Sequence, residues 1–249
     1  LQNKRRSKPV YTREEFEELR LSEAKDMWED KSLKNKAIST LCHADSYHWI
    51  NQTNWQGEPV LQLPQDMFAI QEIILDTKPD HIIEVGVAWG GSLLFYSTLM
   101  AMYGGKSLIG IDIYMPEDMV DRVTKKNIGV ELIFLEGSSL YKETLDHIKN
   151  TVDGKCMVIL DSHHTHEHVL KELNIYSELV SEGCYLICSD TVVEDMPKFH
   201  RAKEWGKGNN PRTALNEFLD SNENFERDER IRNKLLFSCH PDGYLRKVK

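Results

Sequence analysis

Five short apolar runs, recurring roughly every 25 residues through the middle of the chain, constrain the fold most strongly. Helix-like stretches separate them. The runs are HIIEV (81–85), SLIGID (107–112), VELIFLEG (130–137), CMVIL (156–160) and CYLICS (184–189). Strands joined through helices predict a parallel sheet with right-handed crossovers, and continuous apolar content predicts burial on both faces. We therefore predict an α/β fold.

The C-terminal part carries a further strand signal. KLLFSC (234–239) and YLRKV (244–248) flank HPDG, a turn-forming sequence. Two strand-like runs around such a turn are typical of a β-hairpin, which would add an antiparallel edge to the sheet. Helices are predicted after residue 165, ending at Gly183, and over residues 212–220.

The N-terminal part has a different pattern. Residues 11–40 are highly charged and helix-prone, and Thr12 with Glu15 forms a candidate capping box. Residues 41–66 have weak periodicity and predict a loop or short helices that could cover a site. We divide the chain into an N-terminal helical or lid segment (1–66) and a main domain (67–249).

Composition excludes several functional classes. The chain has 249 residues, with 31 basic and 40 acidic side chains and a net charge of −9, which argues against sequence-independent binding of nucleic acid. No apolar run is long enough for a transmembrane helix. The basic start LQNKRRSKPV lacks the apolar core of a secretory signal and predicts a solvated arm. Five cysteines without a C-x-x-C motif predict reduced thiols in a cytoplasmic protein.

The glycine-rich stretch EVGVAWGGS (84–92) lies between the first predicted strand and a helix, where this fold class binds ligands. Gly86 would allow a sharp turn. Gly90 and Gly91 would let backbone approach a ligand, and Ser92 could cap the helix. The spacing is G-x-x-x-G-G rather than the G-x-G-x-x-G of dinucleotide sites.

Two acidic residues refine this prediction. Glu84 beside the loop would repel a pyrophosphate and attract an amine or a sulfonium cation. Asp112 ends the next strand and could accept hydrogen bonds from ribose hydroxyls. The pattern favours S-adenosylmethionine over a nicotinamide cofactor; the alternative without a ligand is a plain strand-to-helix turn. In the following loop, Ser138 or Ser139 could contact an adenine ring or cap a helix.

Two aspartates end the fourth and fifth predicted strands, Asp161 and Asp190. Adjacent strand ends bring their carboxylates close together, and two close carboxylates repel unless a cation or a proton lies between them. Mg²⁺ suits oxygen ligands and keeps positions open for a substrate hydroxyl. A neutral imidazole within reach could then take the hydroxyl proton.

Four histidines follow Asp161 at positions 163, 164, 166 and 168. His163 and His164 are expected in a loop above the sheet edge, where either could face the pocket. His166 and His168 fall in the first turn of a helix and point to different faces, which disfavours joint metal binding. The zinc motif H-E-x-x-H is absent.

These stretches carry a family resemblance. From about residue 54 onward the chain resembles the cephalosporin hydroxylase family, most members of which are S-adenosylmethionine-dependent methyltransferases related to rhamnosyl and macrolide-sugar O-methyltransferases. The most specific match lies in VILDSHHTHEHVLKEL (158–173). The resemblance implies a Rossmann-like class I methyltransferase fold with a mostly parallel seven-stranded sheet, oligomeric assembly, and N-terminal segments that form contacts or lids.

The resemblance also implies roles for site residues. Mg²⁺ would be held by carboxylates at the ends of the fourth and fifth strands, and the residue three positions after the first metal aspartate, His164, would act as base. The family pattern has Glu-Asp at the end of the fifth strand, whereas this chain has Ser189-Asp190. A hydroxyl thus replaces one carboxylate, and Glu194 or Asp195 could be recruited instead.

The sequence therefore predicts an S-adenosylmethionine-dependent, Mg²⁺-dependent O-methyltransferase. Its acceptor would be a hydroxyl of a sugar, a nucleotide-sugar or a glycosylated metabolite, with no nucleic-acid or membrane partner and with homo-oligomeric assembly. The alternatives are a metal-independent N-methyltransferase, an Fe(II) hydroxylase with two histidines and a carboxylate, and a non-catalytic cofactor-binding assembly subunit.

The predicted site residues fall into three groups. The cofactor would be bound by Glu84, Gly86, Gly90, Gly91, Ser92, Asp112, Ser138 and Asp161. The metal would be bound by Asp161, Asp190 and Ser189, and the catalytic residues would be His164 and Asp161. Trp49, Trp55 and Trp89 could stack on a sugar face or belong to the core.

Overall fold

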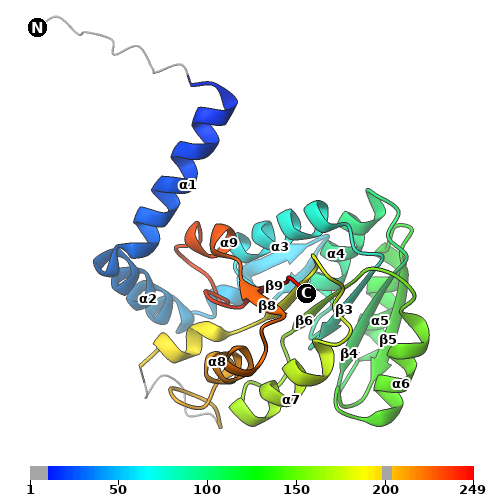
Figure 1. The fold of residues 1–249 in the computed structure, drawn as a ribbon. Coiled ribbons are helices and arrows are strands. Elements are labelled where there is room, and N and C mark those ends of the chain that lie inside the picture. The colour runs from blue at the N-terminus through cyan, green and yellow to red at the C-terminus, as the bar shows by residue number, and fades with distance from the viewer. Residues whose placement is uncertain (1–10, 198–203) are drawn as a thin grey trace, which may run out of the picture.

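The structure, a computed structural model that describes residues 11–197 and 204–249, is built around a seven-stranded sheet (Figure 1). The strands are β3 (His81–Val85), β4 (Ser107–Asp112), β5 (Glu131–Glu136), β6 (Cys156–Leu160), β7 (Tyr185–Cys188), β8 (Phe225–Arg227) and β9 (Tyr244–Lys247). Their order in the sheet is β5-β4-β3-β6-β7-β9-β8, and β3 to β7 run parallel. The predicted α/β fold with a mostly parallel seven-stranded sheet is confirmed.

Helices cover both faces of the sheet because neighbouring strand residues point to opposite sides. Ile82 and Ile83, both fully buried, belong to different apolar clusters. The helices packed on the Ile82 side are α3 (Pro64–Thr77), α4 (Gly91–Ala101), α5 (Glu117–Lys126) and α9 (Glu229–Asn233). Those on the Ile83 side are α6 (Lys142–Thr151), α7 (His166–Tyr176) and α8 (Pro211–Ser221). This is the doubly wound arrangement of a Rossmann-like fold.

The N-terminal helices lie beside this body. The capping box predicted for Thr12 and Glu15 is present at the start of α1 (Arg13–Glu29). This helix has no buried residue, and it extends away from the sheet in Figure 1. The next helix is α2 (Lys31–Asp45). The arm predicted for residues 1–10 lies outside the described residues.

Residues 49–60 form a short 3-10 helix, η1 (Trp49–Gln52), and a separate hairpin of β1 (Thr53–Trp55) and β2 (Glu58–Val60). The buried carboxylate of Glu58 pairs with Arg122 at 3.1 Å and with Lys126 at 2.5 Å, both on α5. The Trp55 ring packs edge-on against Phe95 of α4. These contacts fix the hairpin over the start of α4, at the end of the sheet where the glycine-rich loop lies.

The antiparallel C-terminal edge is present, but the hairpin prediction was wrong in one strand. Strand β9 pairs with β7 on one side and with β8 on the other, and residues 234–239 form no strand. That segment packs against α3, where the Asp66 carboxylate accepts hydrogen bonds from the Ser238 hydroxyl and from the Cys239 backbone N–H at 2.7 Å. The apolar run is therefore buried by tertiary contacts with a helix and not by pairing in the sheet.

Three further predictions concern a helix end, the cysteines and membrane-spanning segments. Helix α7 ends at Tyr176, and a turn follows it before Gly183, so this helix is shorter than predicted. All five cysteines are free, and four of them are buried, as expected for small core residues. Among the described residues, no helix is both long enough and apolar enough to cross a membrane.

Candidate active site

A cavity of about 510 Å³ opens at the carboxyl ends of the parallel strands, between the segments that follow β3, β4, β5, β6 and β7. Most of the predicted site residues line this cavity. They are Glu84, Gly86, Ser92, Asp112, Ser138, Asp161, His164 and Asp190. Three predicted residues do not line it, namely Gly90, Gly91 and Ser189.

The glycines of the loop make room for other parts of the protein. Gly86 has φ +91°, and a Cβ there would lie 2.0 Å from the Asp161 carbonyl oxygen. A Cβ on Gly91 would lie 2.2 Å from the carbonyl oxygen of Pro59 in the hairpin. Gly90, with φ +78°, lies against Val123 of α5. At Gly90 and Gly91 the absence of a Cβ thus makes room for protein groups, and the contact of these residues with a ligand stays a prediction.

Glu84 is buried at the end of β3 and accepts a hydrogen bond from the Ser92 hydroxyl at 3.0 Å. The prediction that Ser92 caps α4 is wrong, because the N-cap residue of this helix is Gly90. Burial raises the pKa of Glu84 to about 8, against the opposing hydrogen bond from Ser92 and with a further rise from the charge of Asp112. A cation beside Glu84 would favour its ionised form.

Asp112, at the end of β4, holds the glycine-rich loop in place. Its Oδ2 atom accepts hydrogen bonds from the backbone N–H groups of Val87 at 2.8 Å and Ala88 at 3.1 Å. Its Oδ1 atom accepts from Tyr114 N–H at 3.3 Å. The carboxylate faces the cavity with its acceptor oxygens already ordered by the loop.

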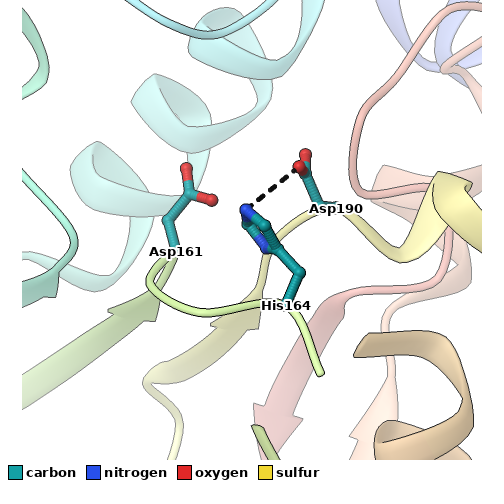
Figure 2. Close-up of side chains that lie close together, drawn as sticks. All are labelled: Asp161, His164 and Asp190. Atoms are coloured by element: carbon teal, nitrogen blue, oxygen red, sulfur yellow. Dashed lines mark ion pairs between the residues drawn. The ribbon is translucent and has the colours of Figure 1, made fainter. Parts of the chain in front are cut away.

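Asp161, His164 and Asp190 converge on one point above the ends of β6 and β7 (Figure 2). One potential ligand atom from each residue lies within 4.8 Å of the others, and His164 Nε2 is 3.5 Å from an Asp190 carboxylate oxygen. Burial raises the pKa of Asp161 well above its usual value, and the nearby carboxylates, Asp190 first among them, raise it further. A cation at this point would relieve that repulsion.

Other potential oxygen ligands lie elsewhere. The Ser189 side chain is buried, and its hydroxyl has no hydrogen-bond partner among the described residues. Glu194 accepts hydrogen bonds from the Gly208 backbone N–H and the Asn210 side chain, and Asp195 pairs with Arg212. The described residues thus bring together two carboxylates and one imidazole, whereas an Fe(II) hydroxylase site needs two imidazoles and one carboxylate.

The four histidines have distinct environments. His166 faces α8, where its ring nitrogens lie 2.8 Å from Thr213 Oγ1 and 3.1 Å from a Glu217 carboxylate oxygen. His163 stacks on His168, with ring centroids 5.4 Å apart, and both line the cavity. His168 lies in the first turn of α7, as predicted, and its ring also lines the cavity.

Glu172 is a site residue that sequence reasoning missed. It is fully buried on α7 and contacts Ser139, Ser162 and His168, all three of which line the cavity. A signal was present in the sequence. Glu172 lies within the apolar stripe of this helix, beside Leu173, and an acidic residue on a buried helix face requires partners.

The tryptophans divide between the core and the cavities. Trp55 Nε1 donates to Thr98 Oγ1 at 3.2 Å and has a packing role. Trp89 is half-exposed at the mouth of the main cavity. Trp49 lines a second, apolar cavity of about 110 Å³, which shares Ile50, Asp190 and Trp205 with the first.

Residues 47–248 match the model of the family described as rhamnosyl O-methyltransferase/CmcI. The chain belongs to this family. Relatives named rhamnosyl O-methyltransferase in Mycobacterium bovis and Mycobacterium leprae are 28% identical over 213 residues, which cover 81% of this chain and 84% and 89% of the relatives. The predicted family and the predicted class of enzyme, a methyltransferase, are confirmed.

Solved structures share the fold. A structure of CmcI with Mg and SAM has a TM-score of 0.55 at 20% identity, covering 80% of this chain and 78% of that one. The O-methyltransferase TomG from Streptomyces achromogenes, in complex with SAM, has a TM-score of 0.53 at 12% identity, covering 86% and 90%. This similarity confirms the Rossmann-like methyltransferase fold.

Proposed function

We propose that this protein transfers a methyl group from S-adenosylmethionine to a hydroxyl of a carbohydrate acceptor, with a divalent cation, Mg²⁺ first, held in the site. The observation that carries the proposal is the convergence of Asp161, His164 and Asp190 beside the cavity. The names of the relatives and the Mg and SAM in the CmcI structure support the same chemistry.

The cofactor fits the residues of the cavity. We assign the amine of the cofactor to the neighbourhood of Glu84, whose raised pKa marks a carboxyl group without a compensating cation. Asp112 would accept from the ribose hydroxyls, and Ser138 would face the base. Gly86, Ser92 and the Asp161 backbone complete the wall. When bound, S-adenosylmethionine supplies an electrophilic methyl group on a sulfonium sulfur.

Asp161 and Asp190 would hold the cation, since both carboxylates lie at one point and the pKa of Asp161 is raised. When bound, the cation supplies Lewis acidity that makes a neighbouring hydroxyl more acidic. The Ser189 hydroxyl, which is buried and does not line the cavity, would not serve as a cation ligand in place of the missing carboxylate. We therefore propose a site with two carboxylates, in which the other cation positions are left to water and to the acceptor.

His164 would act as the base. Its Nε2 atom lies beside Asp190, so the charge that the imidazole gains on taking the hydroxyl proton would be stabilised by a carboxylate 3.5 Å away. The second cavity is lined by Asp190, Trp49 and Trp205, and it shares Asp190 and Trp205 with the first cavity. Aromatic rings beside the reacting point suit a sugar ring carrying an apolar substituent.

Methyl transfer from labelled S-adenosylmethionine to a panel of alkyl and aryl rhamnosides, with amines as a second panel, tests the proposal. We expect transfer to a sugar hydroxyl that stops in excess EDTA and returns with Mg²⁺. Transfer to amines in EDTA would favour a metal-independent N-methyltransferase instead. Tight binding of S-adenosylhomocysteine without transfer to any acceptor would favour an assembly subunit.

A further inference from the structure

We infer that Glu172 is a positioning residue for the cofactor cavity, which fixes the spacing between the loop after β5 and the loop after β6. The inference rests on the proposed function, because that cavity is assigned to S-adenosylmethionine. Glu172 lies beneath the cavity wall, on a helix that provides only His168 to the wall itself.

One carboxylate oxygen gathers three donors from three segments of the chain. Glu172 Oε1 accepts from Ser139 Oγ at 2.5 Å, from Ser162 Oγ at 2.7 Å and from His168 Nε2 at 3.1 Å. Ser139 follows β5, Ser162 follows β6, and His168 lies one turn earlier on α7. This one oxygen therefore joins the loop after β5 to the loop after β6.

The same helix contacts the first loop a second time. The Tyr176 hydroxyl, one turn beyond Glu172, donates to the Ser139 carbonyl oxygen at 2.9 Å. Ser139 is thus held through both its side chain and its backbone. The position of the loop after β5 therefore depends on α7, and α7 begins directly after the segment that carries Asp161 and His164.

Burial makes this arrangement a strong constraint. Glu172 is 0% exposed, and its second oxygen, Oε2, has no partner among the described residues. Hydrogen bonds to a charged acceptor are worth roughly twice those between neutral groups, and a buried carboxylate that loses donors cannot turn to water. The positions of the three donor groups relative to one another therefore depend on one atom, Glu172 Oε1.

The constraint acts on the part of the cavity assigned to a flat ring. His163 stacks on His168 with an angle of 27° between the ring planes, and Ser138 is the neighbour of Ser139. If His168 and Ser139 shift relative to each other, the distance between these two parts of the cavity wall changes. Glu172 would thus set the affinity for the planar base of the cofactor, and not the proton transfer.

Glu172→Gln tests this inference, because the amide keeps the shape and removes the charge that attracts the three donors. The dissociation constant of S-adenosylhomocysteine, measured by calorimetry well below the melting temperature, should rise about 10-fold or more. KM for S-adenosylmethionine should rise by a similar factor, while kcat changes less than about threefold. The matched control is Glu167→Gln, an exposed residue of the same helix paired with Lys171, which should leave all three values unchanged.

A double-mutant cycle separates positioning from simple loss of stability. Ser139→Ala and Ser162→Ala each remove one donor, and their effects on the dissociation constant should be strongly non-additive with Glu172→Gln. A lower melting temperature with an unchanged dissociation constant, or effects that merely add, would overturn the inference. Absence of binding by the wild-type protein would overturn the proposed function as well, so the two failures are distinguishable.

Discussion

His164 is the residue on which the proposed chemistry depends most directly. His164→Ala should lower turnover by about 10²-fold or more, because it removes the acceptor of the hydroxyl proton while leaving Glu84 and Asp112 in place. Steady-state kinetics and S-adenosylhomocysteine calorimetry measure the two effects. His166→Ala is the control, since that ring faces α8 and not the cavity, and its turnover should stay within a few-fold of wild type.

The same ring could be a metal ligand instead of a base, and one measurement distinguishes the two. Pulsed EPR of the Mn²⁺-loaded protein should show no nitrogen coupling if His164 only accepts protons. A nitrogen coupling that disappears in His164→Ala would identify the imidazole as a ligand and contradict its assignment as base.

Glu84 predicts a specific dependence of stability on pH. The pKa of its carboxyl group is about 8 in the folded protein against 4.5 in the unfolded chain. Between these values the folded state keeps a proton that the unfolded state releases, so the free energy of unfolding falls by about 1.4 kcal/mol per pH unit as pH rises. Below pH 4.5 the Glu84 carboxyl group is protonated in both states, and its stabilising contribution to the folded state is fully present.

Glu84→Gln removes this titration. When the pH rises from 5.5 to 7.5, the free energy of unfolding of the variant should fall by about 2–3 kcal/mol less than that of the wild type. Urea unfolding at both pH values measures this difference. Glu178→Gln, at an exposed position, is the control and should follow wild type. Parallel curves for Glu84→Gln and wild type would show that Glu84 is ionised in the folded protein.

At the residue scale, the sequence predicted the Asp161–Asp190 pair because parallel neighbouring strands end at one edge. It could not predict that Ser189 is buried and does not line the cavity. The register pairs Leu160 with Cys188, and extending it by one residue would set Ser189 opposite Asp161. The backbone of Asp190, with φ +53°, departs from that extension, and a positive φ at a non-glycine residue has no clear signal in a single sequence.

At the element scale, Gly91 is the position at which α4 lies in close contact with the β1–β2 hairpin. Gly91→Ala would place a methyl group 2.2 Å from the Pro59 carbonyl oxygen, so the hairpin or the helix must shift. We expect a loss of about 2–3 kcal/mol in the free energy of unfolding and weaker binding of S-adenosylhomocysteine, measured by urea titration and calorimetry. Gly206→Ala, where a Cβ meets nothing within 4 Å, is the matched control. Equal stability of the two variants would contradict the tight contact.

The elements differed in how well their sequences specified them. The five parallel strands were predictable because each is an uninterrupted apolar run bounded by turn residues. The β1–β2 hairpin was not, since its strands have three residues each and their sequence shows no alternation over so short a length. Residues 234–239 misled the prediction, because an apolar run buried against a helix has the same composition as a strand.

At the scale of the whole molecule, Asp66 on α3 links the N-terminal half of the fold to its last strand. The Tyr244 hydroxyl on β9 donates to Asp66 at 2.8 Å, across 178 positions of sequence. Tyr244→Phe should lower the free energy of unfolding by about 2 kcal/mol, measured by urea titration, because a buried carboxylate loses one donor. Tyr114→Phe, at an exposed ring, should have no effect. A loss below 0.5 kcal/mol would show that the bond contributes little.

The overall topology followed from the sequence because the order of strands and helices leaves few arrangements under the right-handed crossover rule. The closing contacts did not follow. Asp66, Ser238 and Tyr244 are distant in the chain, and no local pattern indicates that a carboxylate on one helix will gather hydroxyls from the C-terminal segment.

The left-handed backbone of Asp190 gives this site a cost in fold stability. A non-glycine residue at φ +53° is disfavoured by about 1 kcal/mol or more, and glycine would relieve it while also removing one of two repelling carboxylates. If Asp190 holds the cation as proposed, stability and activity select opposite residues at position 190. A library screened for heat resistance alone would enrich Asp190→Gly, and a library screened for methyl transfer would retain the aspartate.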